Sequence, residues 1–218
     1  MGWQEVVNKI TEVALPNCFN PFSARDDEHD LPDAPKIRTQ NLRKYLEAME
    51  RLKPRIAFVA EAPGYRGMRR TGIPLSSEVL LPKISEFLGT EFKKATRTKA
   101  MSETTARVVW EVIEEIEEPV LLWNAVMVQP TAEDGYHNRT PGKKEILAFQ
   151  DILKEILGEF KPEMVFAVGR TAERALKMLG INAIYVRHPA HGGAEKFRGA
   201  IRFHGRKGDK KSKNATPL

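Results

Sequence analysis

The chain of 218 residues is long enough to bury one well-packed core, and its apolar fraction of 41% is ordinary for a globular protein. Its apolar runs are too short to cross a bilayer, and its single cysteine, Cys18, excludes an internal disulfide and an iron–sulfur cluster held by four cysteines of one chain. The formal net charge of +6 makes phosphates or acidic surfaces the expected partners.

The N-terminal part of the chain is predicted to be mostly helical. Apolar residues at helical spacing indicate one helix over residues 3 to about 14 and a second with Leu42 and Met49 on its apolar side. Prolines and acidic residues between Pro16 and Pro35 predict a long irregular connection between these helices.

A buried strand is predicted at Ile56 to Ala60, where the run is β-branched and aromatic. Pro63-Gly64 closes this run, because proline cannot donate to a sheet ladder and glycine tolerates backbone conformations closed to other residues. We therefore expect the strand to stop there and the backbone to approach a ligand closely. Glu61 places a carboxylate at the exit of the strand.

Three further apolar runs have the same form, and polar residues follow each of them. The runs are Pro119–Trp123, Met164–Val168 and Ala183–Val186, and they lead into Asn124, Gly169-Arg170 and Arg187-His188-Pro189. Runs that are apolar on both faces indicate parallel strands covered by helices on both sides, and ligands of such sheets bind outside the carboxyl ends of the strands. Glu61, Asn124 and His188 follow equivalent strands, so we expect a shared cleft in place of three unrelated turns.

Helices with one apolar face are predicted between these strands, and two segments are predicted to be loops. The expected starting residues of the helices are Ser77, Ser102, Thr140 with Pro141, and Thr171. Residues 65–78 and 129–139 are too polar and glycine-rich for core elements. Loops at strand exits commonly carry function.

We predict one domain over residues 1–204 and a basic flexible tail over residues 205–218, where basic residues are interleaved with Gly, Ser, Asn and Asp. The N-terminus lacks a basic segment followed by an apolar core, so we expect a cytoplasmic monomer without a membrane association, bound to the nucleoid if the source is a prokaryote. His137, His188 and His191 lack the spacing of zinc ligands, so we predict no metal and no cofactor.

Four segments together resemble the uracil-DNA glycosylase superfamily. They are Ala60-Glu61-Ala62-Pro63-Gly64, Trp123-Asn124, Asn138-Arg139-Thr140-Pro141 and His188-Pro189-Ala190-His191-Gly192-Gly193. The resemblance extends from about residue 20 to residue 203. It implies a three-layer α/β/α fold with a central four-stranded parallel sheet, and a DNA glycosylase of base excision repair. Such an enzyme flips uracil or a related altered base into the cleft and hydrolyses its N-glycosidic bond.

The residues at the strand ends suit this chemistry. Cleavage of an N-glycosidic bond builds negative charge on the base and positive charge on the sugar, so the site needs a donor at the base and an anion near the sugar. By resemblance, His188 donates to O2 of the base and Asn124 pairs with N3–H and O4 of uracil. Glu61 orients water or stabilises the sugar cation. The alternative roles are a loop histidine bonded to backbone, an asparagine turn, and a carboxylate that braces loop amides.

Three positions depart from the better-known branches of the superfamily. Ala62 stands where the best-known branch has an aspartate, so a catalytically inactive DNA-binding module is one alternative function. Gly64 stands where a bulky aromatic often blocks thymine, and Leu75 where an aromatic stacks on the base. The motif at Glu61 is more similar to the iron–sulfur branch, but the cysteines of that branch are absent. The predicted base-binding residues are Asn124, Ala62, Pro63, Gly64, Tyr65 and Leu75.

Gly64 leaves the C5 side of the base open, so a 5-substituted pyrimidine, such as a modified cytosine in foreign DNA, is the alternative substrate. Tyr65 or Tyr136 would have to cover that edge to restore strict uracil specificity. A lyase would need an activated lysine in the cleft, which none of the motifs supplies, so we predict a monofunctional enzyme. Pro63 argues against the phosphate loop of a nucleotide-binding enzyme.

DNA contacts are predicted for the basic loops and for the loop that follows His188. The predicted DNA-binding residues are Arg66, Arg69, Arg70, Ser76, Arg139, Arg187, His191, Gly192, Gly193, Lys196 and Arg198. Arginines at such positions neutralise phosphates. Lys196 or Phe197 is expected to fill the gap left by the flipped nucleotide, although Phe197 is equally a candidate core residue.

Overall fold

The structure is a computed structural model that describes residues 2–190 and 192–212, without the side chains of residues 205–212. Its first half contains α1 (Trp3–Glu12), β1 (Cys18–Phe19), α2 (Ala34–Leu52), β2 (Ile56–Ala60), α3 (Met68–Thr71), the short 3-10 helix η1 (Glu78–Leu80), α4 (Leu81–Leu88) and α5 (Thr104–Ile116). Its second half contains β3 (Val120–Asn124), β4 (Gln129–Pro130), α6 (Lys143–Ala148), α7 (Gln150–Phe160), β5 (Met164–Val168), α8 (Arg170–Met178), β6 (Ile184–Val186) and α9 (Ala194–Ser212).

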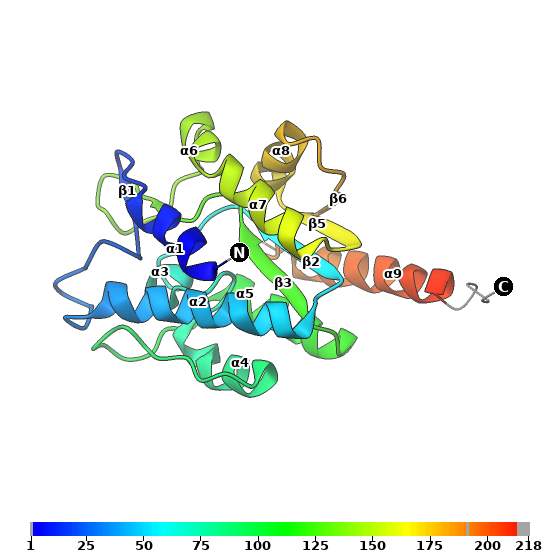
Figure 1. Ribbon diagram of the computed structural model, residues 1–218, viewed down its shortest axis with the longest axis horizontal. Helices are drawn as coiled ribbons and strands as arrows, with labels where there is room; N and C mark the ends of the chain where they lie inside the picture. Colours follow the sequence, from blue (N-terminus) through cyan, green and yellow to red (C-terminus); the bar gives the residue numbers. More distant parts are fainter. Residues whose placement is uncertain (1, 191, 213–218) are drawn as a thin grey trace.

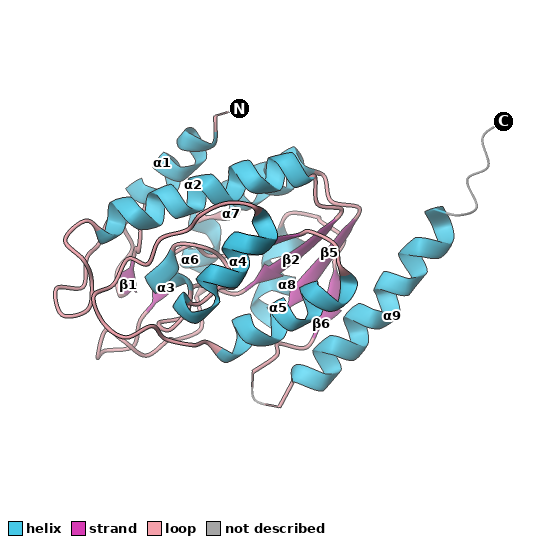
Figure 2. Ribbon diagram, turned by 90° about the horizontal axis from the view of Figure 1, so that it is seen from below, coloured by secondary structure: helices cyan, strands magenta, loops and turns pink. Residues whose placement is uncertain are grey.

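Four strands form a parallel sheet in the order β3-β2-β5-β6. The central strand β2 pairs with both β3 and β5, so that Ile56 lies opposite Val120 and Met164. Every residue of β2 and β3 is buried, as expected for strands that are covered on both faces. Helices α1 and α2 lie on one side of the sheet, and α5 and α9 lie on the other (Figure 1, Figure 2). The predicted α/β fold with a four-stranded parallel sheet between helices is confirmed.

The free edge of β3 is closed by a side chain from α2. The Tyr45 hydroxyl donates to the carbonyl of Leu122 and accepts from its N–H, at 3.0 and 2.6 Å. An unpaired edge strand otherwise presents backbone groups to other chains. Tyr45 is fully buried, and this burial raises the pKa of its phenol above the ordinary value. A separate antiparallel pair, β1 with β4, joins Cys18 to Pro130 near the long N-terminal connection.

Two predicted helix starts are wrong by one or two residues. Helix α5 begins after Glu103 instead of Ser102, because the Glu103 carboxylate accepts from two backbone amides of the first turn, Thr105 N and Ala106 N, at 3.0 and 2.6 Å. Helix α6 begins after Gly142 instead of at Pro141, because Glu145 accepts from the Gly142 N–H at 2.7 Å.

Two further residues do not act as the predicted caps. Ser77 precedes η1, but its hydroxyl makes no capping bond and has no partner among the described residues. Thr171 lies inside α8, which begins after Gly169, and its hydroxyl is directed to another strand end. The second case arises because short polar side chains bond tertiary partners as readily as local amides.

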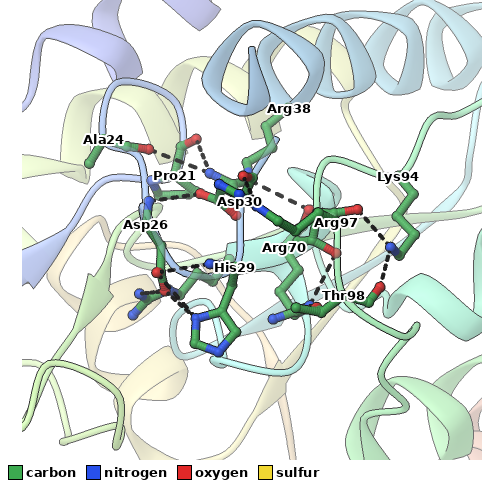
Figure 3. A network of polar contacts seen from close by, with 12 residues as sticks. Pro21, Ala24, Asp26, His29, Asp30, Arg38, Arg70, Lys94, Arg97 and Thr98 are labelled. Carbon is green, nitrogen blue, oxygen red and sulfur yellow. Dashed lines mark hydrogen bonds and ion pairs between the residues drawn. The ribbon is translucent and has the colours of Figure 1, made fainter. Parts of the chain in front are cut away.

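The segment 65–78 was predicted to be a loop outside the core, and the structure corrects this prediction. Residues 67–78 are buried and include the short helix α3. Three buried arginines in and around this segment pair with carboxylates. The pairs are Arg38 with Asp30, Arg69 with Asp26, and Arg70 with Glu78. Figure 3 shows how the 21–30 connection, α2 and the segment near Thr98 converge on these charges. Charge pairing thus allows a polar sequence to be buried.

Replacing Glu78 by alanine is expected to lower the free energy of unfolding by about 3–5 kcal/mol, because it leaves the Arg70 guanidinium buried without its counter-charge. The side chains of this pair are 2% and 0% exposed, and their closest atoms lie 2.7 Å apart. Urea denaturation followed by circular dichroism measures the change. Glu86→Ala on the exposed side of α4 is the control and should change stability by less than about 0.5 kcal/mol. Equal stability of the two variants would contradict the prediction.

The C-terminal helix continues past the predicted domain boundary. Helix α9 extends to Ser212 and so covers residues 205–212 of the predicted tail. The extent of the domain stays a prediction. Within the ranges that the structure describes, none of the helices combines the length and apolar character that crossing a bilayer requires.

Candidate active site

A cavity of about 690 Å³, here called the main cavity, lies at the carboxyl ends of the parallel strands. Glu61 follows β2, Asn124 ends β3 and His188 follows β6, and all three line this cavity. The structure therefore brings together the three polar residues that the strand pattern singled out. Eight predicted catalytic, base-binding or DNA-binding residues line it: Glu61, Ala62, Pro63, Gly64, Leu75, Asn124, Arg187 and His188.

The carboxylate of Glu61 is held by a residue from α8. The Thr171 hydroxyl donates to Glu61 Oε2 at 2.5 Å, from a position 110 residues further along the chain. No described backbone amide donates to this carboxylate, so the alternative role of bracing loop amides does not fit the structure. The second carboxylate oxygen is left for other partners at the cavity wall.

Asn124 is buried and carries a polar atom that no described residue contacts by a hydrogen bond. Its side chain amide nitrogen lies 3.0 Å from the sulfur of Met68. Its Oδ1 atom is buried and accepts no hydrogen bond from any described residue, and the residue is 2% exposed. A buried acceptor without a partner is rare in native proteins and costs about 1–3 kcal/mol. In a residue that lines a cavity, this acceptor is the expected contact for a donor on a ligand.

The orientation of His188 is set by its own loop. The Ala190 N–H donates to His188 Nδ1 at 3.2 Å, so Nδ1 is the acceptor of the neutral ring and Nε2 carries the hydrogen. Gly169 and Gly193 pack against this residue. A Cβ added to Gly193 would lie 2.0 Å from the His188 carbonyl oxygen, so only glycine fits there. The loop therefore presents a neutral imidazole as a hydrogen-bond donor.

Leu75 forms part of the cavity wall in a strained backbone conformation. Its φ angle is 50°, in the left-handed region that disfavours a leucine. The Trp110 indole N–H donates to the Leu75 carbonyl at 3.1 Å and holds the segment in place. Backbone strain of this kind persists only where the surroundings fix it, and it clusters at functional sites.

A second cavity of about 390 Å³ lies beside the main cavity. The two cavities share three lining residues, Gly64, Glu103 and Asn138. Tyr65 and Tyr136 line the second cavity and not the main one, and their rings meet edge to face at 5.4 Å. Neither tyrosine therefore stands at the wall of the main cavity where the sequence allowed a cover over the C5 side of a base.

The residues predicted to bind DNA divide into exposed and internally bonded groups. Arg66, Arg187, Gly192 and Lys196 are exposed. Arg69, Arg70 and Ser76 are 4%, 2% and 1% exposed, so the expectation that they contact DNA does not fit their burial. Arg139 pairs with Glu145, and Arg198 pairs with Glu111 and Glu195.

The loop after His188 is described only in part. His191 lies outside the described residues, and Gly193 is buried beneath the carbonyl of His188. Phe197 is fully buried and packs edge to face on Phe58, which makes it a core residue and not a wedge for the duplex. The exposed Lys196 is left as the predicted gap-filling residue.

Several residues of the site escape sequence reasoning. Glu103, Asn138, Arg170, Thr171 and Tyr185 line the main cavity, but none was predicted as a site residue. Asn138 lies in one of the resembling segments, which was a usable signal. The Arg170 guanidinium lies 4.1 Å from the centre of the exposed Tyr185 ring at the cavity rim. Among the described residues, no three His, Cys, Asp or Glu side chains are grouped to hold a metal ion.

The fold and the cavity define an α/β protein whose polar ligand site lies at the carboxyl edge of a parallel sheet. The model of the Uracil DNA glycosylase superfamily matches residues 48–209, and the chain belongs to this superfamily. The chain is thereby assigned to a family of DNA glycosylases, and the resemblance seen in the sequence is confirmed.

A solved structure has a similar fold. It is the crystal structure of wild-type SMUG2 from Pedobacter heparinus, with a TM-score of 0.60 and 12% sequence identity. The similarity covers 94% of this chain and 99% of that chain. A search of curated protein sequences found no match.

Proposed function

We propose that the protein is a monofunctional DNA glycosylase that flips uracil or a related altered base into the main cavity and hydrolyses its N-glycosidic bond. Membership of the superfamily supports the class of reaction. The observation that carries the proposal is the buried Oδ1 of Asn124, which lines the cavity without a partner among the described residues. A donor at N3 of a uracil ring satisfies this atom.

Asn124 selects the base in this proposal. Its Oδ1 accepts from N3–H, and its Nδ2 donates to O4 in place of the contact with Met68. A thioether sulfur is a weak acceptor, so a carbonyl oxygen replaces it readily. Cytosine presents an acceptor at N3 and an amino donor at C4, and therefore mismatches both groups of the amide.

His188 and Glu61 serve the two charges that develop as the bond breaks. The bond between C1′ and N1 breaks with its electron pair going to the base, and the Nε2–H of His188 stabilises the resulting negative charge at O2. Glu61, held by Thr171, faces the sugar cation and takes a proton from the water that adds to C1′. Ala62 lines the cavity without a carboxylate, so Glu61 is the carboxylate of this motif.

The surroundings of the cavity support a hydrolase that acts without a covalent lysine intermediate. No lysine is among the described residues that line the main cavity. The exposed charges of Arg66, Arg187 and Lys196 are available to phosphates around it. Arg69 and Arg70 support the fold through their buried pairs instead.

The proposal is tested with duplex and single-stranded oligonucleotides that each carry one altered base. Excision under single-turnover conditions, followed by alkali cleavage at abasic sites, should occur with uracil or a related deaminated or 5-substituted base and not with normal DNA. Strand cleavage without alkali would contradict a monofunctional enzyme. DNA binding without excision of any base in the panel would favour the inactive DNA-binding module.

Thr171→Val is expected to lower the excision rate about 10-fold, because an ionised carboxylate that loses its hydroxyl donor is held less firmly over the reacting sugar. The effect should fall on the single-turnover rate at saturating enzyme, with DNA affinity little changed. Thr171→Ser keeps the hydroxyl and is the matched control, which should retain most of the activity. Equal losses in both variants would show that the hydrogen bond to Glu61 does not set the rate.

A further inference from the structure

The second cavity lies on the side of the main cavity to which C5 of a bound pyrimidine points, if the base binds as in the proposed function. The strand order places Asn124 on the edge strand β3, and His188 follows β6 at the opposite edge. In the proposed function, O2 of the pyrimidine faces His188, and its N3–O4 side faces Asn124. C5 adjoins the carbonyl carbon C4, so it lies on the Asn124 side of the ring and away from His188. The second cavity is lined by residues after β2, before α5 and after β4, and not by His188.

The wall between the two cavities is thin at Gly64. Gly64, Glu103 and Asn138 line both cavities, and Gly64 contributes no side chain. A Cβ added to Gly64 would lie 3.5 Å from Asn138 Nδ2, which is ordinary contact, whereas a larger side chain would extend into the passage. In the inference below, a substituent on C5 crosses from the main cavity to the second cavity at Gly64.

The amide of Asn138 has a fixed orientation at this passage. The Arg69 guanidinium donates to Gln129 Oε1 at 2.8 Å, so Gln129 must present Nε2 to its other neighbours. Gln129 Nε2 donates to Asn138 Oδ1 at 2.5 Å, and the Tyr65 N–H donates to the same oxygen at 3.3 Å. Because arginine can only donate, neither the Gln129 amide nor the Asn138 amide can be turned by 180° without losing these hydrogen bonds. Asn138 Nδ2 is therefore a donor beside Gly64.

Asp26 holds Arg69, the first residue of this series of hydrogen bonds. It accepts from Arg69 Nη2 at 3.0 Å. Burial raises the pKa of Asp26, but hydrogen bonds and the nearby charges of His29 and Arg69 outweigh burial, so the net pKa lies below the ordinary value. The carboxylate therefore stays ionised at neutral pH and holds Arg69 in place.

The second cavity is lined by aromatic rings, by charged side chains of both signs and by hydrogen-bonding groups. Tyr65 and Tyr136 meet at an interplanar angle of 80° and form a corner. Arg66 adds a positive charge and Glu103 a negative one, so the lining favours neither sign of charge on a substituent. Both oxygens of Glu103 accept backbone N–H groups and have further acceptor capacity. Such a lining suits a neutral group that carries several hydroxyls.

We propose that the second cavity binds the substituent on C5 of the target pyrimidine, and that this substituent is a neutral polyhydroxylated group such as a sugar attached through a hydroxymethyl linker. This inference rests on the proposed function for the placement of the base. A volume of about 390 Å³ is far larger than a methyl or hydroxymethyl group requires, and it is open to a group of hexose size. The ligand class is thus a glycosylated 5-hydroxymethyluracil in DNA.

The test measures binding separately from excision. Duplexes carry one 2′-fluoro nucleotide, which resists hydrolysis, with uracil, 5-hydroxymethyluracil or glucosylated 5-hydroxymethyluracil as the base. Competition binding to the wild-type protein should favour the glucosylated base over uracil by about 10-fold or more, the scale of two neutral hydrogen bonds. Equal affinity for the three duplexes, or weaker binding of the glucosylated one, would overturn the inference.

Two variants probe the passage and its donor. Gly64→Tyr should lower the affinity for the glucosylated duplex about 5- to 100-fold more than the affinity for the uracil duplex, because the ring fills the passage. Asn138→Asp keeps an oxygen that accepts from Gln129 and from the Tyr65 N–H, but it replaces the donor beside Gly64 with an acceptor. The preference for the glucosylated duplex over the uracil duplex should fall about 5-fold. Asn182→Asp, at an exposed position, is the charge-matched control and should keep the preference.

Failure of the inference is distinguishable from failure of the proposed function. Excision of uracil without any preference for the glucosylated duplex would overturn only the inference. A preference that Gly64→Tyr abolishes, in a protein that excises no base, would overturn the enzymatic proposal and support the second cavity. If Tyr136→Ala lowers the affinity for all three duplexes equally, a neighbouring nucleotide occupies the second cavity, and the inference is overturned.

Discussion

His188→Ala should lower the single-turnover rate of base excision by about 10²-fold or more, the scale for losing one preorganised donor to a developing anion. The Ala190 N–H fixes Nδ1 as an acceptor, so the neutral ring carries its hydrogen on Nε2. The donor is thus in place before the bond breaks. Alanine removes this donor without adding a larger side chain to the cavity.

Binding and folding provide the controls for this variant. Affinity for a duplex with a non-hydrolysable target nucleotide should stay nearly intact, because the histidine acts on a charge that develops only as the bond breaks. His188→Gln restores a side chain donor and should recover part of the rate. Full single-turnover activity of His188→Ala would remove this residue from the mechanism, and a large drop in thermal stability would assign it a structural role.

The sheet and the position of the cleft were predictable because their signals are local. Each of the four strands is an apolar run bounded by proline, glycine or a polar residue, and all four runs form strands within one residue of the predicted limits. Parallel strands bring their carboxyl ends to the same edge. Three residues far apart in the sequence could therefore be placed at one cavity without knowledge of any tertiary contact.

The supporting contacts were not predictable, because their partners lie far apart in the chain. Arg69 meets Asp26 across 43 positions and Gln129 across 60, and Thr171 meets Glu61 across 110. An arginine in a glycine-rich loop has the same local sequence whether it faces a phosphate or a buried carboxylate. Likewise, a threonine at the start of a helix is indistinguishable from a cap until the opposite strand end is placed.

Asn124→Asp is expected to lower uracil excision by about 10²-fold or more and to give weak excision of cytosine. An ionised carboxylate faces O4 with an acceptor where the amide offered a donor, and each mismatched buried group costs about 1–3 kcal/mol. When protonated, the carboxyl group offers one donor and one acceptor and can match N3 and the amino group of cytosine. Cytosine excision should therefore rise as the pH falls.

The buried Oδ1 of Asn124 makes the alanine variant equally informative. Asn124→Ala removes both contacts to the base and also the unpartnered acceptor, so the free protein should be no less stable than the wild type, whereas uracil excision should fall strongly. Rates for uracil, cytosine and thymine in the same duplex, with thermal denaturation of each variant, separate selectivity from folding. An alanine variant that excises uracil at the wild-type rate would show that Asn124 does not pair with the base and that its free acceptor has another use.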